Sequence, residues 1–585
     1  MPPTGDGNIK FTKFFDNLNV FANILWNFFI VIMKGKIASF LIAFLLLGFN
    51  SIFADENPPY VKINIKPYET LYEGDKINCT IKNANRFFWK IEDGSNHTTF
   101  YGDDILLFDP EPTPLEKEYV NLTLYAENEH GIACDSIPVK IKRLYFGDIH
   151  WHTDISDGQY DIDTMYQNAL KDNFLDFAAC SDHAELIDLP NTIFGGVPPN
   201  DFLKTLIDWI LGRSEWELIK EKAQEYYIPG KFSTLLAFEW TAAQWSPGGW
   251  DGWEDVGHIN FYYRDVYEDA PKYSFYSKLD FDDICEAMAE EWEKGHYCIG
   301  FPHHPQGKIY FNIFGKKLPC SFTVNWSYLA EGMENKNARD KVLRGGEVYS
   351  RWGTAIGQYY TPGIPWLYGY DEESFYNLTD AWMENAFWEW SEHCRQRKFV
   401  MIASSDTHNV NRPGSVQGEF GNIGNPSGIV AIYAVHNTRH EIWDALNACD
   451  AYAIQAQKLR VLMKCDGKVA YGRWINCSIP LRIEINAMAT FDGNDSSGKS
   501  MCPHGYNGSL NFKITDIWIV KKDRQKGRPW CKVIAHFTPN NEIAVVSYKD
   551  YSVEPNDFYW VAIKQSNGID AYMAFLGPVF IYDVK

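Results

Sequence analysis

The sequence has no run of clustered lysine and arginine residues. Among its 585 residues, 76 are Asp or Glu and only 54 are Lys or Arg, which gives a formal net charge of −22. Proteins that bind the phosphate backbone of nucleic acids need clusters of basic side chains. This lack excludes nucleic acid as the expected partner. It leaves room for a small substrate, including a phosphorylated one, held by a few local cations.

An uninterrupted apolar stretch long enough to cross a membrane is also missing. A spanning helix needs roughly 20 apolar residues, and two lysines interrupt the apolar region 20–49. The basic start near Met33, the apolar middle and the small-residue exit at Ala54 are typical of a secretory signal peptide. We expect residues 1–54 to be an upstream extension and a signal peptide cleaved after Ala54. The mature protein would be secreted or periplasmic, without a stable membrane span; a membrane anchor is the alternative.

The cysteines do not have the closely spaced pairs of a zinc ribbon, although the chain contains 12 of them. Export would permit disulfide bonds. Cys79, Trp89 and Cys134 have the order found in immunoglobulin-like domains, where two such cysteines form a bridge. Two buried thiols without a bridge are the alternative.

The changes of pattern along the chain predict three domains after the signal peptide, because 585 residues exceed one ordinary core. Short alternating segments over 57–142 predict an immunoglobulin-like β-sandwich. Over 144–455 strands alternate with helices, such as the one indicated by the spacing of Ile162, Met165 and Tyr166, which favours a mainly parallel sheet. Strand patterns return over 456–585. The expected architecture is therefore multidomain α/β plus β, with a β-rich C-terminal domain.

A series of metal-type side chains lies at the ends of apolar segments in the middle region. Side chains two apart in a strand point to the same face, so His150 and His152 can reach one ion. Asp157 follows in a turn that ends in glycine. Similar residues recur at later segment ends: Asp182, His183, Glu239, His258, His303, His304, Asp406 and His408. They converge if the strands are parallel neighbours, as in a β/α barrel.

The order of these motifs resembles the PHP superfamily, named for polymerase and histidinol phosphatase. The motif His-x-His-Thr-x-x-Ser-Asp-Gly at 150–158 is followed by Asp-His, a strand-end Glu, Gly-His, His-Pro and Asp-x-His. The resemblance implies a distorted, TIM-like (β/α)7 barrel over 144–455 that holds two or three divalent ions of zinc, manganese or iron. Segments such as Phe238-Glu-Trp-Thr also resemble a subgroup of large, often exported PHP-like proteins with a domain of unknown function.

The resemblance assigns ligands to individual ions. One ion takes two histidines and two carboxylates: His150, His152, Glu239 and Asp406. Glu239 bridges to a second ion held by His258 and His304. His304 is preferred to His303 because the family's ligand directly precedes proline, although a bulge would reverse the choice. A third group would either bind another ion or form a network around the ligands: Asp157, His183 and His408.

Such a site predicts hydrolysis, because coordination to a metal lowers the pKa of water from 15.7 to roughly 7 and a neighbouring ion polarises the bond under attack. Relatives in the family mostly cleave phosphoesters, and others cleave amides, carbamates or esters. We expect a metal-dependent hydrolase, foremost a phosphoesterase, with Asp406, His408 and Glu239 at its catalytic centre. The alternative from another class is a surface-binding protein that keeps the barrel as a scaffold.

Several further residues have predicted roles beside the ligands. Guanidinium groups bind phosphate oxygens in a bidentate way, and Arg412 is the first candidate, followed by Lys308 and Arg351. Each is alternatively a surface residue paired with carboxylates of this acidic protein. Glu347 ends another apolar strand and either orients a ligand histidine or lies at the rim. Asp182 is expected to orient its neighbours rather than to bind metal.

Overall fold

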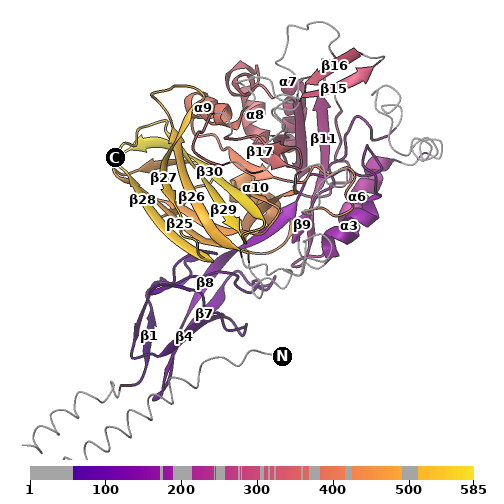
Figure 1. Ribbon diagram of the computed structural model, residues 1–585. Helices are drawn as coiled ribbons and strands as arrows, with labels where there is room; N and C mark the ends of the chain where they lie inside the picture. Colours follow the sequence, from indigo (N-terminus) through magenta and orange to yellow (C-terminus); the bar gives the residue numbers. More distant parts are fainter. Residues whose placement is uncertain are drawn as a thin grey trace, which may run out of the picture. The chain divides into compact units, whose positions relative to one another are not determined.

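The computed structural model shows a chain built mainly of strands (Figure 1). The predicted signal peptide and His304 lie outside the residues that the structure describes. These residues are 57–171, 175–188, 212, 214–242, 244–245, 257–274, 277–278, 280–303, 308–313, 316–321, 324–357, 360–365, 367, 382–414, 425–490 and 512–585. They divide into two compact units, one that includes 57–62, 80–87 and 125–134, and a larger one that holds the rest. No helix among the described residues has the length and apolar character needed to cross a membrane.

Short strands fill the first described segment, as the alternating pattern predicts. They are β1 (Tyr60–Ile63), β2 (Thr70–Tyr72), β3 (Cys79–Lys82), β4 (Arg86–Ile91), β5 (Phe100–Tyr101), β6 (Asp104–Ile105) and β7 (Val120–Asn128). Cys79 and Cys134 are free thiols, the first partly buried and the second exposed. The suspected bridge is therefore absent, and the alternative of two buried thiols is wrong for Cys134. The immunoglobulin-like assignment stays a prediction.

One long strand, β8 (Gly131–Asp148), runs through the boundary predicted between 142 and 144 and leads directly to His150. Its last five residues are buried. The strands that follow it toward the ligands are β9 (Phe177–Ala178), β10 (Ser233–Thr234), β11 (Leu236–Ala242), β13 (Gly257–Tyr263), β14 (Cys298–His303), β17 (Gly345–Ser350) and β19 (Val400–Ala403).

The pairings of these strands form a circuit that returns to β8. The strands β8, β9 and β10 are parallel, a parallel bridge joins His183 to Glu239, and β17 is parallel to β19. Parallel bridges also join Gly300 to Leu343 and Trp151 to Thr407. The exception is β13, which is antiparallel to both β11 and β14. No described helix lies between β11 and β13, and antiparallel neighbours need no helical crossover. The (β/α)7 description stays a prediction.

Helices accompany these strands: α3 (Ile162–Leu170), α6 (Glu215–Glu225), α7 (Phe281–Glu293), α8 (Lys336–Val342), α9 (Met383–His393), α10 (Arg439–Ala448) and the π-helix η3 (Tyr328–Gly332). The predicted helical spacing in α3 is confirmed, because Ile162, Met165 and Tyr166 are buried. Asp161 caps the start of this helix. Its side chain accepts a hydrogen bond from the Thr164 N–H and so satisfies an otherwise unpaired donor.

The C-terminal strands extend the sheet that contains β8. The sheet runs in the order β8, β20 (Gly428–Ala434), β21 (Ala451–Gln455), β30 (Ala571–Val584), β29 (Phe558–Ser566), β26 (Lys513–Lys522) and β27 (Cys531–Phe537), with β24 (Trp474–Cys477) beside β30. A second sheet contains β23 (Lys468–Val469), β22 (Arg460–Cys465), β25 (Leu481–Met488) and β28 (Ile543–Asp550). One sheet thus contains strands from both sides of the domain boundary predicted at residue 456.

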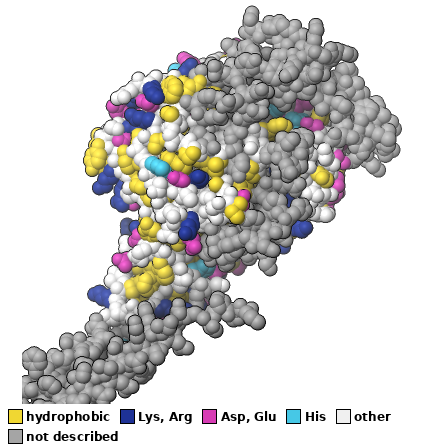
Figure 2. All heavy atoms as spheres, in the orientation of Figure 1, with side chains coloured by type: hydrophobic (Ala, Val, Ile, Leu, Met, Phe, Trp, Pro, Cys, Tyr) yellow, Lys and Arg dark blue, Asp and Glu magenta, His cyan; other side chains and the backbone are white. Residues whose placement is uncertain are grey.

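Smaller elements complete the described fold. They are the hairpin strand β18 (Gly353–Thr354) next to β17 and a three-stranded sheet of β12 (Gln244–Trp245), β16 (Lys316–Ser321) and β15 (Lys308–Ile313). On the face shown in Figure 2, the blue basic and magenta acidic side chains are interspersed rather than gathered by sign.

Candidate metal centre

Residues that lie far apart in the sequence meet in one cluster at the ends of the circuit of strands. Their donor atoms form four overlapping sets, each compact enough to surround an ion: His150, His152 and Asp406; His150, Glu239 and His303; His183, Glu239 and His258; His152, Asp157, His183 and His408. We describe them as three groups that follow the ions predicted from the sequence: a first group of His150, His152, Glu239 and Asp406, a second of Glu239, His258 and His303, and a third of Asp157, His183 and His408. The structure thus brings together every ligand predicted from the sequence except His304, which lies outside the described residues. These clusters are compatible with a metal site.

The first group has the spacing of a four-coordinate site. The Nε2 atom of His150 lies 3.1 Å from Glu239 Oε2 and 3.2 Å from Asp406 Oδ1. The Nε2 atom of His152 lies 3.3 Å and 3.1 Å from the same two oxygens. Zinc ligands at about 2.0–2.2 Å in a tetrahedron are separated by about 3.3–3.6 Å. These four nitrogen–oxygen separations are therefore close to those that such an ion requires.

Glu239 connects the first group to a second one through its other oxygen. Its Oε1 atom lies 2.6 Å from His258 Nδ1 and 3.3 Å from His303 Nε2. His258 and His303 are direct partners in the antiparallel pairing of β13 with β14. Directly opposed side chains share one face of a sheet, so this register turns both imidazoles toward Glu239. The two oxygens of Glu239 thus face different histidines, and His303 lies beside the second oxygen. That this carboxylate bridges two ions stays a prediction.

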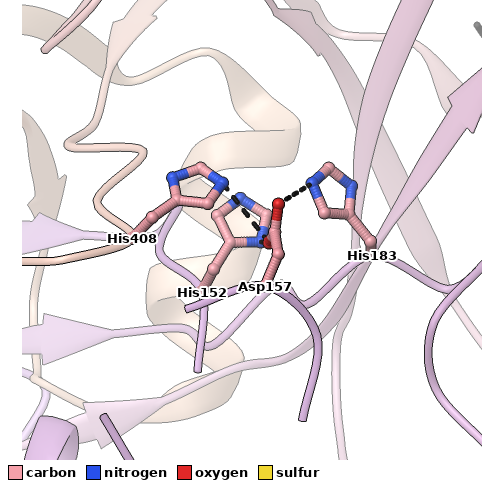
Figure 3. Close-up of side chains that lie close together, drawn as sticks. All are labelled: His152, Asp157, His183 and His408. Carbon is pink, nitrogen blue, oxygen red and sulfur yellow. Dashed lines mark ion pairs between the residues drawn. The ribbon is translucent and has the colours of Figure 1, made fainter. Parts of the chain in front are cut away.

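The third group lies around Asp157, as Figure 3 shows. Its carboxylate reaches His183 Nε2 at 3.6 Å and His408 Nε2 at 3.4 Å. The side chains of Asp157, His183 and His408 are 27%, 14% and 21% exposed, whereas His150 and Glu239 are 0% and 1% exposed. The cluster is therefore buried at its first group and open to solvent at its third.

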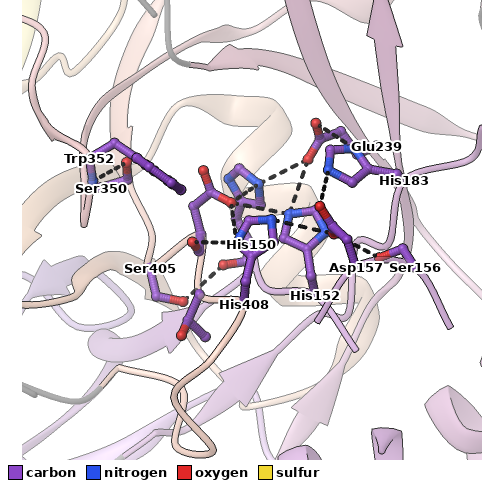
Figure 4. A network of polar contacts seen from close by, with 12 residues as sticks. His150, His152, Ser156, Asp157, His183, Glu239, Ser350, Trp352, Ser405 and His408 are labelled. Carbon is purple, nitrogen blue, oxygen red and sulfur yellow. Dashed lines mark hydrogen bonds and ion pairs between the residues drawn. The ribbon is translucent and has the colours of Figure 1, made fainter. Parts of the chain in front are cut away.

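Neighbouring groups fix which nitrogen His150 and His408 offer; both rings are labelled in Figure 4. Glu347 Oε2 lies 3.1 Å from His150 Nδ1, which leaves Nε2 for the first group. His408 Nδ1 lies 3.2 Å from the Asp406 carbonyl oxygen, an acceptor, so Nδ1 carries the proton and Nε2 faces Asp157. A bond of this kind orients the ring and raises the basicity of the other nitrogen. Glu347 has the orienting position predicted for it.

Replacing Glu347 with glutamine is expected to weaken the first group without removing a ligand. The amide keeps the size of the side chain but loses the charge that supports the His150 ring. Loss of such a partner costs about 10- to 100-fold in metal affinity or activity. Metal titration of the variant against the unmodified protein measures this effect. Equal affinities would show that Glu347 has no orienting role.

Two buried aspartates hold the loops that carry the ligands. Asp182 accepts hydrogen bonds from Thr153 N at 2.7 Å and from Ser156 Oγ at 2.5 Å, which fixes the turn before Asp157. It therefore orients its neighbours, as predicted. Sequence reasoning missed Asp148, which accepts from Ser405 N at 2.9 Å and ties the end of β8 to the segment before Asp406. Burial raises the Asp148 pKa to about 6.

Thr241 is a second residue that sequence reasoning missed. Its hydroxyl lies 2.8 Å from Glu239 Oε1 and 2.8 Å from His183 Nδ1. It follows Glu239 by two positions in β11, and side chains at that spacing share a face. The two-residue spacing from Glu239 could have pointed to Thr241 as a neighbour of the site. Threonine is so common in strands that this spacing alone does not single it out.

Carboxylates control the protonation of the cluster in the metal-free protein. Burial disfavours the charged form of His152, but the hydrogen bonds to Asp406 and Glu239 outweigh it and raise the pKa to about 10. Burial is likewise outweighed at His183, where the charges of Glu239 and Asp157 raise the pKa to about 9. Burial favours the neutral form of Glu239, yet the surrounding histidines hold its pKa well below the usual range. The imidazoles of His152 and His183 therefore hold protons that a metal ion must displace.

Metal affinity is expected to rise with pH from about 6.5 to about 10. Each displaced proton contributes up to about tenfold per pH unit in this window. The raised pKa values of His152 and His183 also stabilise the metal-free fold. This contribution is complete below the ordinary histidine pKa of 6.5, and it is lost as pH rises through about 9 to 10. Competition titrations with a chelator of known protonation, at several pH values, measure the slope. An affinity independent of pH would contradict this account.

The predicted phosphate-binding cations have different surroundings. Arg351 is buried, and its backbone N–H donates to the carbonyl of Ser405, next to Asp406, at 3.1 Å. Arg412 is partly buried in the segment that follows His408. The Lys308 side chain lies outside what the structure describes. Arg351 is thus anchored next to the first group, although the sequence favoured Arg412.

Comparisons with known proteins give one partial match to a family. No curated protein matches the chain. A solved two-domain protein from Bacteroides vulgatus ATCC 8482, described as containing a predicted PHP-like metal-dependent phosphoesterase, is 13% identical, with 72% of this chain and 90% of that chain covered and a TM-score of 0.29. A Bacteroides uniformis β-glucuronidase is 8% identical, with 90% of this chain and 61% of that chain covered and a TM-score of 0.16.

Likenesses this distant carry no inference about fold or activity. The family model describes a protein of unknown function (DUF3604) and matches residues 379–466. This segment contains Asp406 and His408, from the first and third groups. The comparisons thus connect one ligand-bearing part of the chain to a domain whose function is unknown.

Proposed function

We propose that the protein is a metal-dependent hydrolase of the PHP type that cleaves phosphate esters of small molecules. The observation that carries the proposal is that the Nε2 atoms of His150 and His152 each lie 3.1–3.3 Å from a carboxylate oxygen of Glu239 and one of Asp406, with Glu239 shared by a second group. A fold without a metal has little reason to bury so many polar groups together.

The donor set fits two or three divalent ions of zinc, manganese or iron. Imidazole nitrogen suits these metals, whereas calcium and magnesium prefer oxygen ligands alone. The three carboxylates Asp157, Glu239 and Asp406 would offset part of the charge of ions held this close together. Ions bound here would lower the pKa of water and polarise the bond under attack.

The protein's own residues position these components. Glu239 lies between the first two groups with one oxygen toward each, which fixes their separation. Glu347 and the Asp406 carbonyl hold the rings of His150 and His408 in one orientation. Since the third group is the exposed side of the cluster, a substrate would enter beside Asp157 and His408. The backbone N–H of Arg351 holds the segment that carries Asp406.

The alternatives differ in the bond cleaved or in whether catalysis occurs. The same site could hydrolyse amides, carbamates or carboxylic esters, since these reactions also require activated water and a polarised bond. The remaining alternative is a non-catalytic binding protein that keeps the metal cluster as part of a scaffold.

Turnover by the full chain, loaded separately with zinc, manganese or iron, tests the proposal. Aryl phosphates are compared with aryl esters of the same leaving group, so that only the bond under attack changes. The proposal predicts hydrolysis of the phosphate that stops when a chelator removes the metal and returns when the metal is restored. Preference for the ester would support the first alternative. Stoichiometric metal without turnover would support the scaffold.

A further inference from the structure

Trp352 lies beside the open side of the metal cluster. It occupies the two-residue connection between β17 and β18, whose pairing joins Ser350 to Gly353. Its ring centroid is 6.1 Å from that of His408, and the two rings are nearly perpendicular. Figure 4 shows the indole directed from this connection toward the histidines. Trp352 is thus adjacent to a member of the third group, where a substrate would enter.

The exposure of this side chain is unusual for the protein. Trp352 is 38% exposed, and every other tryptophan whose side chain the structure describes is buried or partly buried. Tryptophan has a large apolar surface that normally gains free energy when it is buried. The exposed part of this indole lies beside the cluster and is accessible to a ligand that enters there.

Backbone hydrogen bonds fix the position of the indole relative to the ligands. The N–H of Trp352 donates to Ser350 Oγ at 3.2 Å. The adjacent residue, Arg351, donates its N–H to the Ser405 carbonyl at 3.1 Å, and its own carbonyl accepts from Asn425 N at 3.2 Å. Since Ser405 precedes Asp406, the connection is tied to a segment that carries first-group donor atoms. A ring that packs on Trp352 would lie at a defined place relative to the bond under attack.

We propose that Trp352 forms one wall of a subsite for a flat ring in the leaving group of the substrate. The inference rests on the proposed function and makes the substrate class more specific: phosphate esters of aromatic alcohols or of sugars. Both have a flat face, either a π-system or one side of a sugar ring, that can pack on an indole. A phosphate ester of an open-chain alcohol has no such face and would leave this wall unused.

Kinetics of the metal-loaded full chain test the subsite. The substrates are p-nitrophenyl phosphate, glucose 6-phosphate and glycerol 3-phosphate, which carry an aromatic ring, a sugar ring and no ring. For W352A we expect KM for at least one ringed substrate to rise by about tenfold, since loss of an aromatic stacking partner has effects of this size. The value of kcat and the KM for glycerol 3-phosphate should stay within about twofold. Whichever ringed substrate shows the rise identifies the leaving-group class.

Two further variants separate stacking from other causes. W352F keeps an aromatic surface and should retain most of the affinity for the ringed substrate. Y551A removes an aromatic side chain that is 71% exposed in the turn after β28 and should change none of the constants. A rise in KM that is the same for ringed and open-chain substrates, or no rise for either ringed substrate, would overturn the subsite.

A binding measurement keeps this inference distinct from the proposed hydrolysis. Phenylphosphonate and methylphosphonate carry a similar anionic head and cannot be hydrolysed at the phosphorus–carbon bond by this chemistry. Calorimetric titration should show that W352A loses affinity for phenylphosphonate but not for methylphosphonate. This result would support the subsite even if no phosphate ester were turned over. Equal affinities of the unmodified protein and W352A for phenylphosphonate would exclude an aromatic leaving group, and together with an unchanged KM for glucose 6-phosphate they would overturn the subsite even if hydrolysis were established.

Discussion

Replacing Asp406 with asparagine is expected to lower turnover by about 10³-fold or more, which corresponds to about 4 kcal/mol in the activation barrier. The carboxylate oxygen lies 3.2 Å from His150 Nε2 and 3.1 Å from His152 Nε2, so its charge completes the first group. The backbone at Asp406 is left-handed, with φ of +52°. Asparagine tolerates this conformation as well as aspartate does. The variant therefore removes a charged ligand without adding backbone strain.

The measurement compares kcat/KM and metal content of D406N with those of D466N. Asp466 also has a left-handed backbone, with φ of +47°, and lies in the turn between β22 and β23. It is the matched control because the same change is made in the same backbone conformation outside the cluster. D466N should keep full metal content and activity. If D406N also keeps both, Asp406 is not a ligand.

Replacing Glu239 with glutamine is expected to have an effect at least as large, because it alters two groups at once. One oxygen lies 3.1 Å from His150 Nε2, and the other lies 2.6 Å from His258 Nδ1. A neutral amide offers only one good ligand atom, its oxygen, and so cannot bridge. We expect the bound metal to fall by at least one ion per chain and turnover to fall by about 10³-fold or more.

Elemental analysis and activity measurements compare E239Q with E384Q, which serves as the control. Glu384 is also fully buried, but it lies in α9 and accepts a hydrogen bond from Thr361 Oγ1. Burial raises its pKa to about 7, so a neutral amide there resembles a form that the protein already populates. E384Q should therefore fold and retain its metal. Unchanged metal content in E239Q would show that Glu239 does not bridge.

The sequence predicted which residues form the first group, because side chains along an extended segment alternate between two faces. The two-residue period of an extended segment predicts that His150 and His152 share one face. In the structure both residues lie just beyond the end of β8, and both Nε2 atoms lie near Asp406. The choice between His303 and His304 depends on register, which no local pattern fixes. In the structure the pairing of β13 with β14 sets His303 opposite His258. That register is a tertiary property.

The less predictable features also depend on contacts between distant parts of the chain. Asp148 binds the backbone near Asp406 across 257 positions, and nothing in its own segment indicates that contact. The antiparallel direction of β13 is not visible in its apolar pattern, because all seven of its residues are buried. The boundary expected at 456 came from a change in local pattern, whereas the pairing of β21 with β30 continues the sheet across it.

Anomalous diffraction from crystals of the full chain grown with zinc or manganese tests the central claim most directly. The account predicts a peak of anomalous density within about 2.0–2.2 Å of donor atoms from His150, His152, Glu239 and Asp406, and a second peak on the other side of Glu239. An absence of density at both positions under saturating metal, with these side chains still paired to one another, would contradict it.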